Sequence, residues 1–520
     1  MIIQKRRLSS GSISLKETLW SAANKMRGVM DASEYKHIVL GLIFLKFVSS
    51  NFIEYQMILR NKLVIQSEDP KFIESKLEDK DMFIKNNQIW VPKIARWENL
   101  QPTSGSLGIQ IDKAMSALET HNPNLHDILP KGYEKKELDQ RILEEVFTLI
   151  GRINHENNPS VDTLGGVYEY FLGKFAKLEG RRAGQFFTPK PVVRLLVELL
   201  QPFSGIVYDP CCGSGGMFIQ SHEFITAKGG NQSDIAIYGQ ESNPTTWKLA
   251  KMNLAIRGID ADLGLVFADT FHNNQHKSLK ANYILSNPPF NDRDWDDKGL
   301  LINDSRWTYG IPPRRNANYA WIQHVISHLS DEGFAGIVLA NGSLNSQNNR
   351  DLHIRMNLIK NNLVDCIISL PSQLFISTTI SACIWIINKN KSISAHQTNR
   401  DFILFIDGRD IGFMLDRRYR DMSNEDITLI SSIYDNWKSN NEYNDVGGLC
   451  KSVSIQEVMN NNYNLIPGSY VDIENKSNSE RDFMDEFTKL ESLLLSEMKL
   501  SHQLEKNIKA TLEEIKDILS

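Results

Sequence analysis

Short apolar runs, separated by polar turns and amphipathic stretches, make up the middle of the chain. Seven of them have the length and composition of strands: 206–208, 235–239, 263–268, 283–285, 334–339, 364–369 and 382–387. Between the runs the apolar residues take helical spacing, as in 191–200, where Thr188 is the expected N-cap. Strands that alternate with helices predict an α/β fold built on a doubly wound sheet.

The two ends of the chain follow different patterns. Residues 1–155 mix helical apolar periodicity with polar stretches, and the run 40–47 indicates a buried helix. The polar segment 157–160, Asn-Asn-Pro-Ser, is typical of a linker. We therefore expect a helical N-terminal domain at 1–155, an α/β domain at 156–475 and a long C-terminal helix at 476–520.

An apolar stripe marks this last segment. Its members recur at three- or four-residue spacing, with interruptions at Glu497, Ser501 and Thr511. They are Phe483, Phe487, Leu490, Leu494, Leu504, Ile508, Ile515 and Ile518. Such a stripe packs either on its own domain or on a partner.

Composition places the chain among ordinary water-soluble proteins. Of its 520 residues 41% are hydrophobic and 23% are charged. No run of about 18 apolar residues stands out, so we expect no membrane span, and the first residues lack the apolar core of a signal peptide. Five cysteines without CxxC spacing suit a reducing, cytoplasmic compartment and give no metal site.

The first candidate for chemistry follows the run 283–285. Asn287 is succeeded there by Pro288, Pro289 and Phe290. An Asn oxygen accepts a hydrogen bond from an exocyclic amine, a neighbouring carbonyl accepts the second proton, and an aromatic ring stacks on the base that carries the amine. The tetrapeptide resembles the catalytic motif of amino-group DNA methyltransferases. A Pro-Pro turn after a strand is the simpler alternative.

A glycine-rich turn follows the run 206–208. It begins at Asp209 and contains Gly213, Ser214, Gly215 and Gly216. The glycines allow the backbone to approach a ligand closely. The pattern is not a dinucleotide fingerprint, because its third glycine would fall at Phe218, and the chain has no Walker A sequence. The turn resembles the S-adenosylmethionine loop of class I methyltransferases, in which Asp209 would face the methionine amine.

Two further carboxylates occur in order between this turn and Asn287. Glu241 follows the run 235–239, where a ribose diol is bound in related folds, and Asp269 follows the run 263–268. Asp269 would accept from the adenine amine of the cofactor. Each carboxylate alone is an ordinary strand-end cap, but their order favours a cofactor site.

The segment ahead of the first helix adds a fourth motif. Gln185, Phe186, Phe187, Thr188 and Pro189 precede the amphipathic run 191–200. The segment resembles the additional cofactor-contacting motif of the same enzymes. The alternative is a capped helix in which the phenylalanines form a hydrophobic staple.

Together these motifs resemble the modification (methyltransferase) subunit of type I restriction-modification systems, a class I S-adenosylmethionine-dependent N6-adenine DNA methyltransferase. The resemblance extends to 19–20, 35–41, 318–321 and 462–465. It implies methyl transfer from S-adenosylmethionine to adenine N6 in DNA, with a separate specificity subunit and a restriction (nuclease and translocase) subunit as partners. It implies that the C-terminal helix meets the specificity subunit.

The resemblance also assigns roles to residues. The catalytic set is Asn287, Pro288, Pro289 and Phe290, and the cofactor-binding set is Gln185, Phe186, Phe187, Thr188, Pro189, Asp209, Gly213, Ser214, Gly215, Gly216, Glu241 and Asp269. The pair Cys211-Cys212 departs from the small residues of many relatives, which we expect to be tolerated because the backbone makes the contacts.

Other acceptors and other classes of function remain open. Similar Asn-Pro-Pro-aromatic motifs occur in cytosine-N4, rRNA guanine-N2 and protein glutamine methyltransferases. A non-catalytic scaffold that keeps only the fold is a further alternative, against which the intact motifs argue.

The net charge bears on the partner. A value of −5 is unusual for a chain that binds DNA alone, since phosphate contacts dominate affinity. Basic pairs or clusters occur at 5–7, 181–182 and 314–315, and the last lies in a proline-containing loop where a phosphate would pass. The acidity fits a subunit that relies on a partner for DNA affinity and sequence reading.

Overall fold

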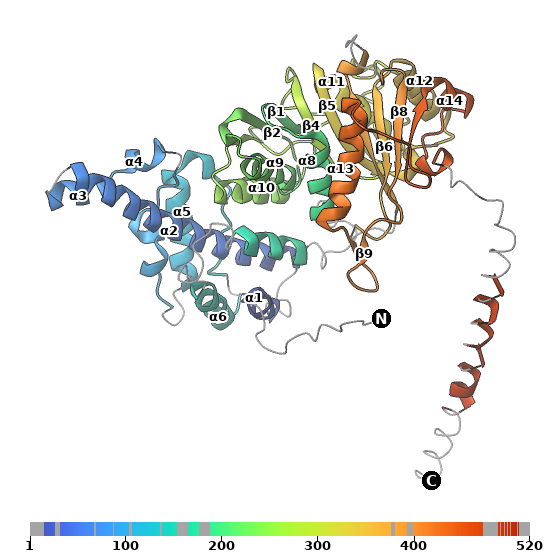
Figure 1. Cartoon of the computed structure of the whole chain (residues 1–520). Helices are drawn as coiled ribbons and strands as arrows, with labels where there is room; N and C mark the ends of the chain where they lie inside the picture. Colours follow the sequence, from blue (N-terminus) through green and yellow to red (C-terminus); the bar gives the residue numbers. More distant parts are fainter. Residues whose placement is uncertain are drawn as a thin grey trace.

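The structure is a computed structural model, and it consists of a helical part and a sheet part (Figure 1). It describes residues 15–25, 32–66, 69–86, 88–102, 107–135, 138–152, 165–175, 188–375, 380–392 and 399–471, with parts of 487–508. The expected domain boundaries near 155 and 475 and the linker at 157–160 lie outside these residues, so they stay predictions.

The helical part surrounds one long central helix. Its elements are α1 (Leu15–Asn24), α2 (Ala32–Gln66), α3 (Pro70–Leu77), α4 (Lys80–Ile84), α5 (Leu107–His121), α6 (Gln140–Gly151) and a helix at 165–175, with short turns η2 (Lys93–Ala95), η3 (Trp97–Asn99) and η4 (Pro123–Leu125). The run 40–47 lies in α2 and is buried almost throughout, as the sequence predicts. At Gly41 a side chain would overlap Tyr133, whose hydroxyl donates to the Ile38 carbonyl at 3.0 Å.

Helix α2 is long and apolar enough, by length and composition alone, to cross a membrane. The candidate stretch is Tyr35–Ile65, and 72% of its most apolar window is buried inside the fold. It packs against α3, α6 and α10 (Pro244–Ile256). Burial of this kind is typical of a core helix.

Nine strands form one mixed sheet in the order β11-β8-β6-β7-β5-β4-β1-β2-β3. The strands are β1 (Gly205–Asp209), β2 (Ile235–Gly239), β3 (Ala261–Asp262), β4 (Ala281–Ser286), β5 (Leu329–Ala340), β6 (Val364–Ser369), β7 (Ala382–Asn388), β8 (Phe402–Asp407) and β11 (Cys450–Ser454). Strand β7 runs antiparallel to both neighbours and β11 antiparallel to β8, whereas the other pairs are parallel. A separate ribbon pairs β9 (Phe413–Met414) with β10 (Arg420–Asp421).

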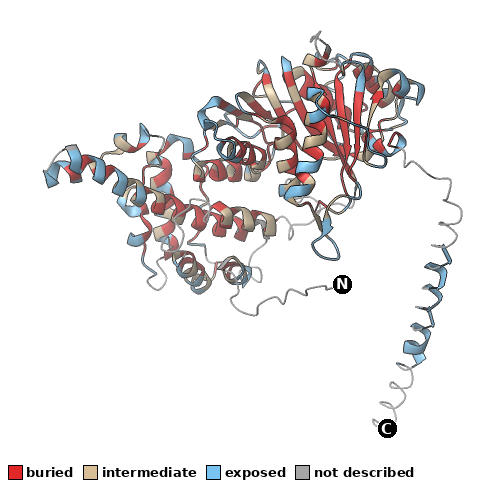
Figure 2. Cartoon of the chain, in the orientation of Figure 1, coloured by how far each residue is buried: buried red, intermediate tan, exposed pale blue. Residues whose placement is uncertain are grey.

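Helices cover both faces of the sheet, which confirms the doubly wound fold. One core cluster joins the sheet to α8 (Lys190–Leu200), α9 (Gly216–Ala227), α10 and α13 (Asn424–Ser439). A second joins it to α11 (Asn318–His328), α12 (Asn349–Lys360) and α14 (Ile455–Asn460). Figure 2 shows the resulting layer of buried strands between partly exposed helices.

Strand order places a crevice next to β1. The chain passes from β1 to β2 and β3 on one side, then returns to β4 on the other side. Ligands of open α/β sheets bind where the order reverses, beyond the carboxyl ends of the strands. The segments after β1, β2 and β4 all meet at this edge.

Two local predictions are wrong. The run 263–268 is not a strand: β3 ends at Asp262, and Leu265 is 91% exposed in the loop that follows. Gly264 turns the chain there with φ +77°, so the apolar run leaves the sheet. Thr188 is not the N-cap of α8, which is Pro189 and makes no side-chain capping bond. The other six predicted strands form, although β8 and β11 were not predicted.

Candidate active site

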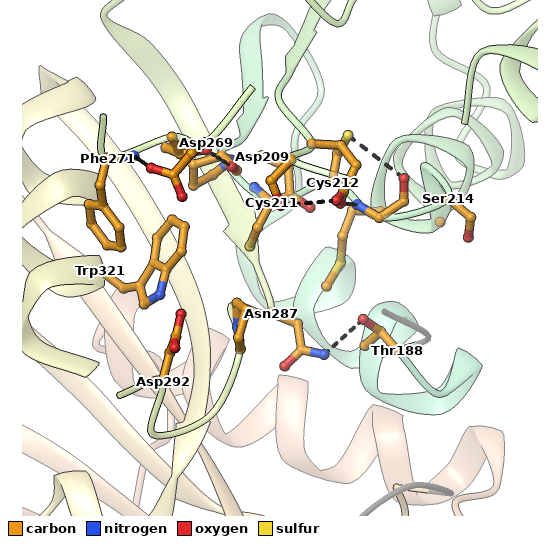
Figure 3. A pocket seen from close by; sticks show the side chains of 18 residues that line it. Thr188, Asp209, Cys211, Cys212, Ser214, Asp269, Phe271, Asn287, Asp292 and Trp321 are labelled. Carbon is orange, nitrogen blue, oxygen red and sulfur yellow. Dashed lines mark hydrogen bonds between the residues drawn. The ribbon is translucent and has the colours of Figure 1, made fainter. Parts of the chain in front are cut away.

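A pocket lies at the carboxyl edge of β4, β1 and β2 (Figure 3). The empty space between its walls is about 800 Å³, including the part open to solvent. Its lining residues are Thr188, Asp209, Pro210, Cys211, Cys212, Gly213, Ser214, Gly216, Met217, Glu241, Ser242, Asp269, Thr270, Phe271, Asn287, Pro289, Asp292 and Trp321. The structure thus brings together residues from four of the sequence motifs.

The glycine turn between β1 and α9 forms one wall. Gly213 and Gly215 have φ values of +54° and +82°, which side-chain-bearing residues rarely adopt. Gly215 is also the N-cap of α9, without a side-chain cap. The turn is held from outside, because Asn253 Nδ2 donates to the Ser214 carbonyl at 2.8 Å.

Asp209 ends β1 and is buried beneath this turn. Its Oδ1 accepts from the Cys211 amide and from the Ser286 hydroxyl, both at 3.0 Å. Burial raises the pKa of Asp209 to about 7, and the hydrogen bonds oppose this only in part. Within the described part of the chain, no hydrogen bond to Oδ2 is present, so that oxygen is left for a donor in the pocket.

Glu241 follows β2 and ties two loops together. Its Oε2 accepts from the Gly213 amide at 3.1 Å, and its Oε1 accepts from the Asn243 amide at 2.7 Å. Burial raises the pKa of Glu241. The Ser242 hydroxyl also donates to Oε1, at 3.5 Å. Oε2 retains a second lone pair, so it can accept from a ligand hydroxyl without losing the bond to Gly213.

Asp269 is the most exposed of the three carboxylates. Its Oδ1 accepts from the amides of Phe271 and His272 at 2.9 and 2.8 Å, and it contacts the His272 ring at 3.0 Å. These contacts close a turn and leave Oδ2 at the pocket. Although the predicted strand before Asp269 is absent, the Ala268 amide donates to the Glu241 carbonyl at 2.9 Å and fixes the loop at this edge.

Asn287 follows β4 and faces the pocket beside Thr188 (Figure 3). Its Nδ2 donates to Thr188 Oγ1 at 3.0 Å. Its Oδ1 is buried and has no hydrogen-bond partner among the described residues. A buried acceptor without a partner is uncommon in a folded protein, so this oxygen is a candidate for ligand contact.

The other members of the predicted catalytic set lie around Asn287. Pro289 lines the pocket, but Phe290 does not. The half-buried ring of Phe290 makes an edge contact with Phe375, with 5.4 Å between ring centroids. Pro288 is placed here because it lies between Asn287 and Pro289 in the chain.

Some predicted residues cannot be placed. Gln185, Phe186 and Phe187 lie outside the described residues, as do the basic clusters at 5–7 and 181–182. Of the remaining basic pair, Arg314 donates to the carbonyls of Asp296 and Asp297, and Arg315 is exposed.

The cysteine pair is accommodated without a metal site. Cys212 is buried, and its amide donates to the Gln240 carbonyl at 2.9 Å. Cys211 Sγ lies 3.0 Å from Ser286 Oγ, beside Asp209. Burial raises the pKa of both thiols. No cluster of three or more possible metal ligands occurs in the described part of the chain.

Phe271, Asp292 and Trp321 line the pocket although they are not among the predicted site residues. Phe271 and Trp321 pack together with 4.2 Å between ring centroids, and Asp292 lies below Trp321 in Figure 3. Trp321 Nε1 is buried and has no partner among the described residues. Burial raises the pKa of Asp292. Trp321 belongs to the segment 318–321, which carries the family resemblance. The sequence, however, gave no indication that its ring lines the pocket.

Comparison with known proteins agrees with this geometry. Residues 159–479 match the N-6 DNA Methylase family, and residues 15–150 match the HsdM N-terminal domain. The chain is 43% identical over 444 residues to the Type I restriction enzyme HindI methylase subunit of Haemophilus influenzae, covering 81% of this chain and 99% of that protein. It is 34% identical to the MjaIX methylase subunit of Methanocaldococcus jannaschii, covering 88% and 83%.

Solved structures share the fold. The type I restriction-modification methyltransferase subunit from Streptococcus thermophilus superposes with a TM-score of 0.71 at 23% identity, covering 88% of this chain and 99% of that one. With the two family matches and the relatives above, the chain belongs to the N-6 DNA methylase family, among the methylase subunits of type I restriction systems.

Proposed function

We propose that this chain transfers the methyl group of S-adenosylmethionine to the N6 amine of adenine in DNA. It acts as the modification subunit of a type I complex, in which a separate specificity subunit reads the DNA sequence and a restriction subunit is the third component. The observation that carries the proposal is the buried, unpartnered Oδ1 of Asn287, a residue that lines the same pocket as Asp209, Glu241 and Asp269.

The pocket residues fit the cofactor. Asp209 would hold the methionine ammonium, Glu241 the ribose hydroxyls, and Asp269 the adenine amine, while Phe271 and Trp321 offer an aromatic wall for the adenine ring. The glycine turn lets backbone amides approach the methionine portion. Gln185, Phe186 and Phe187 are proposed to add contacts from the segment before α8.

The catalytic role of Asn287 follows from hydrogen bonding. S-adenosylmethionine supplies an electrophilic methyl group bonded to a positively charged sulfur. Asn287 Oδ1, with the Pro288 carbonyl, would accept both protons of the adenine amine. This weakens conjugation of the nitrogen lone pair with the ring and directs it toward the methyl carbon. No strong base is needed beforehand, because the amine becomes acidic as the new N–C bond forms.

The base must leave the duplex to reach Asn287. Flipping costs a few kcal/mol and is offset by stacking in the site. Phe290 is the proposed stacking surface, and its contact with Phe375 fixes the orientation of the ring.

The decisive experiment is long-read modification mapping of genomic DNA. The chain is expressed with its genomic neighbours in a methylation-free host, beside Asn287→Ala and a control, Asn361→Ala, at the exposed end of α12. We expect N6-methyladenine at a split recognition sequence in the wild type and the control, and none in Asn287→Ala. Binding of labelled S-adenosylmethionine should persist in all three.

Other acceptors predict other results. Modified cytosine would indicate N4 transfer, and unmodified DNA from an assembled complex would point to an RNA or protein acceptor. Absence of cofactor binding by the wild type would leave the scaffold interpretation. Methylation by Asn287→Ala at the wild-type level would refute the proposed role of Asn287.

A further inference from the structure

A short β-ribbon projects from the sheet part between β8 and α13. Strands β9 and β10 pair antiparallel, with Met414 opposite Arg420 and Phe413 opposite Asp421. Figure 1 shows the ribbon extending below α13, and Figure 2 shows that it is largely exposed. It has no role in the pocket described above.

The tip of the ribbon has a defined shape. The Leu415 amide donates to the Tyr419 carbonyl at 2.8 Å. The amides of Arg418 and Tyr419 both donate to Asp416 Oδ1, at 2.7 and 3.0 Å. A carboxylate that accepts two backbone amides closes a turn in the manner of an Asx turn. The exposed side chains of the tip are therefore carried by an ordered turn.

The base of the ribbon is fixed to the sheet part. Gly412 has φ +86°, and a side chain there would lie 2.4 Å from the Asp421 carbonyl oxygen. The Arg420 amide donates to the Gln373 carbonyl at 3.0 Å, and its Nη1 donates to the Ile411 carbonyl at 3.1 Å. Ser423, two residues after the ribbon, forms the capping box of α13.

Strand directions place the ribbon at the edge that carries Asn287. Strand β8 runs parallel to β6, β6 and β5 each run antiparallel to β7, and β5 runs parallel to β4. The carboxyl ends of β8 and β4 therefore lie at the same edge of the sheet. The link is also physical, because Gln373 holds the ribbon and Phe375, two residues later, contacts Phe290.

The ribbon presents an apolar and a cationic surface. Phe413, Met414 and Leu415 are 48%, 43% and 62% exposed. Arg417 and Arg418 are exposed, and their guanidinium groups have no hydrogen-bond or ion-pair partner among the described residues. Two free guanidinium groups on a chain of net charge −5 form a local cationic site. Arginine and apolar side chains on one projection suit a polyanion that also exposes flat apolar groups.

We propose that the ribbon 412–421 contacts the DNA beside the target adenine. Arg417 and Arg418 bind backbone phosphates, and the apolar residues of β9 and Leu415 pack against the bases left when the adenine leaves the stack. The inference rests on the proposed function, since it assumes that DNA reaches Asn287. It adds a DNA contact belonging to this chain, distinct from those supplied by a specificity subunit.

The first test uses the double variant Arg417→Ala/Arg418→Ala in the complex with the specificity partner. The probe is a fluorescent duplex that contains the sequence identified by modification mapping. Its Kd should rise about tenfold or more, and the slope of log K against log salt should become less steep by about 2, because each lost phosphate contact removes about 0.9.

A matched control has the same change of charge at the opposite edge. Lys360→Ala/Arg400→Ala replaces two exposed cations, at the end of α12 and just before β8. We expect wild-type DNA affinity and slope from this variant. Both variants should bind S-adenosylmethionine as the wild type does, so a loss of the cofactor site is distinguished from a loss of the DNA contact.

The second test concerns the apolar residues. A variant with Phe413, Met414 and Leu415 replaced by serine is mixed with a duplex carrying 2-aminopurine at the target position. We expect the fluorescence increase on base flipping to fall at least severalfold, while the arginine contacts keep duplex affinity within about threefold.

Three outcomes overturn the inference. Wild-type DNA affinity and salt slope in the arginine variant would exclude the phosphate contacts. Wild-type 2-aminopurine fluorescence in the serine variant would exclude the apolar contact. A third outcome is that either variant assembles poorly with a protein partner, while the complexes that do form bind DNA normally. This result would make the ribbon a protein-docking surface.

Discussion

At the scale of single residues, the protonation of Asp209 bears on its proposed contact with the cofactor. Its carboxyl is half protonated near pH 7, because burial raises its pKa to about 7. Below that pH the neutral acid cannot pair with an ammonium group. We predict that S-adenosylmethionine affinity falls as pH decreases, by up to about tenfold per unit below the pKa.

Equilibrium dialysis from about pH 5.5 to about pH 7.5 measures this dependence. Asp209→Asn, which cannot ionise, should bind weakly and show little change over the range. Equal pH dependence in the wild type and in this variant would show that another group titrates.

The contact between Thr188 and Asn287 supplies a second prediction. Thr188→Val removes the acceptor for Asn287 Nδ2, so the amide is free to rotate and Oδ1 is no longer aimed. We expect the methylation rate to fall about tenfold, corresponding to about 1.4 kcal/mol, with a smaller effect on cofactor affinity. Thr188→Ser keeps the hydroxyl and should restore most of the rate; failure of this rescue would argue against hydrogen bonding.

The sequence was informative about residue types at this site but not about their partners. The order Asp209, Glu241, Asp269 and Asn287 was sufficient to predict a common pocket, because each follows a strand or a run mistaken for one. Thr188 was assigned to the cofactor-contacting motif and was also expected to cap a helix, but local sequence cannot show that its hydroxyl contacts a residue 99 positions away. Trp321 was missed for the same reason: its ring reaches the pocket only through the packing of α11.

At the scale of elements, a chain of polar contacts links the helical part to the glycine turn. Arg257 Nη2 donates to Glu169 Oε1 at 3.0 Å and its Nη1 donates to Asn253 Oδ1 at 2.6 Å. Asn253 in turn holds the Ser214 carbonyl. Glu169 lies on the helix at 165–175, and Arg257 follows α10. Positioning of the cofactor turn therefore depends on a helix outside the sheet part.

This path gives a prediction for Arg257→Ala. The substitution removes the cation that joins Glu169 to Asn253, so we expect S-adenosylmethionine Kd to rise about tenfold, or about 1.4 kcal/mol. Lys248→Ala is the control, because Lys248 on the same helix pairs with Asp127 of the helical part at 3.8 Å but does not contact Asn253. An equal loss of cofactor affinity in both variants would indicate that the contact between the two parts of the chain matters in general, and not the path through Asn253.

Strand prediction succeeded where burial and apolarity coincided. The runs of β4, β6 and β7 were recognised because most of their residues are apolar. The run 263–268 has the same composition but is mostly exposed, and a single glycine with positive φ diverts it from the sheet. Burial is a property of tertiary structure, so the apolar pattern alone could not separate the two cases.

At the scale of the whole molecule, the C-terminal segment is set apart by its exposed apolar side chains. Phe487, Leu490 and Leu494 are between 51% and 61% exposed on helical residues that lie away from the sheet part (Figure 1). Phe483, Ile515 and Ile518 of the predicted stripe lie outside the described residues. The exposure supports the interpretation of a helix for subunit contact over packing on the chain's own domains.

We predict that Leu490→Glu/Leu494→Glu prevents association with the specificity subunit. If the interface buries these two leucines, replacing them with carboxylates costs several kcal/mol there. The melting temperature and cofactor binding of the isolated chain should not change. Ser492→Glu/Ser496→Glu adds the same charge on the opposite face of the helix and should still associate. Co-purification with the tagged specificity subunit measures both, and association of the leucine variant would contradict this assignment.

The unpartnered oxygen of Asn287 also has a consequence for the protein's evolution. A buried acceptor without a hydrogen bond lowers the free energy of unfolding by about 1–3 kcal/mol. Asn287→Leu, similar in shape, should therefore raise the unfolding free energy by about 1 kcal/mol even after the bond to Thr188 is lost. Stability alone would therefore favour leucine at this position, and the proposed catalytic role of Asn287 accounts for the asparagine. At position 287, after β4, stability and activity therefore favour different residues.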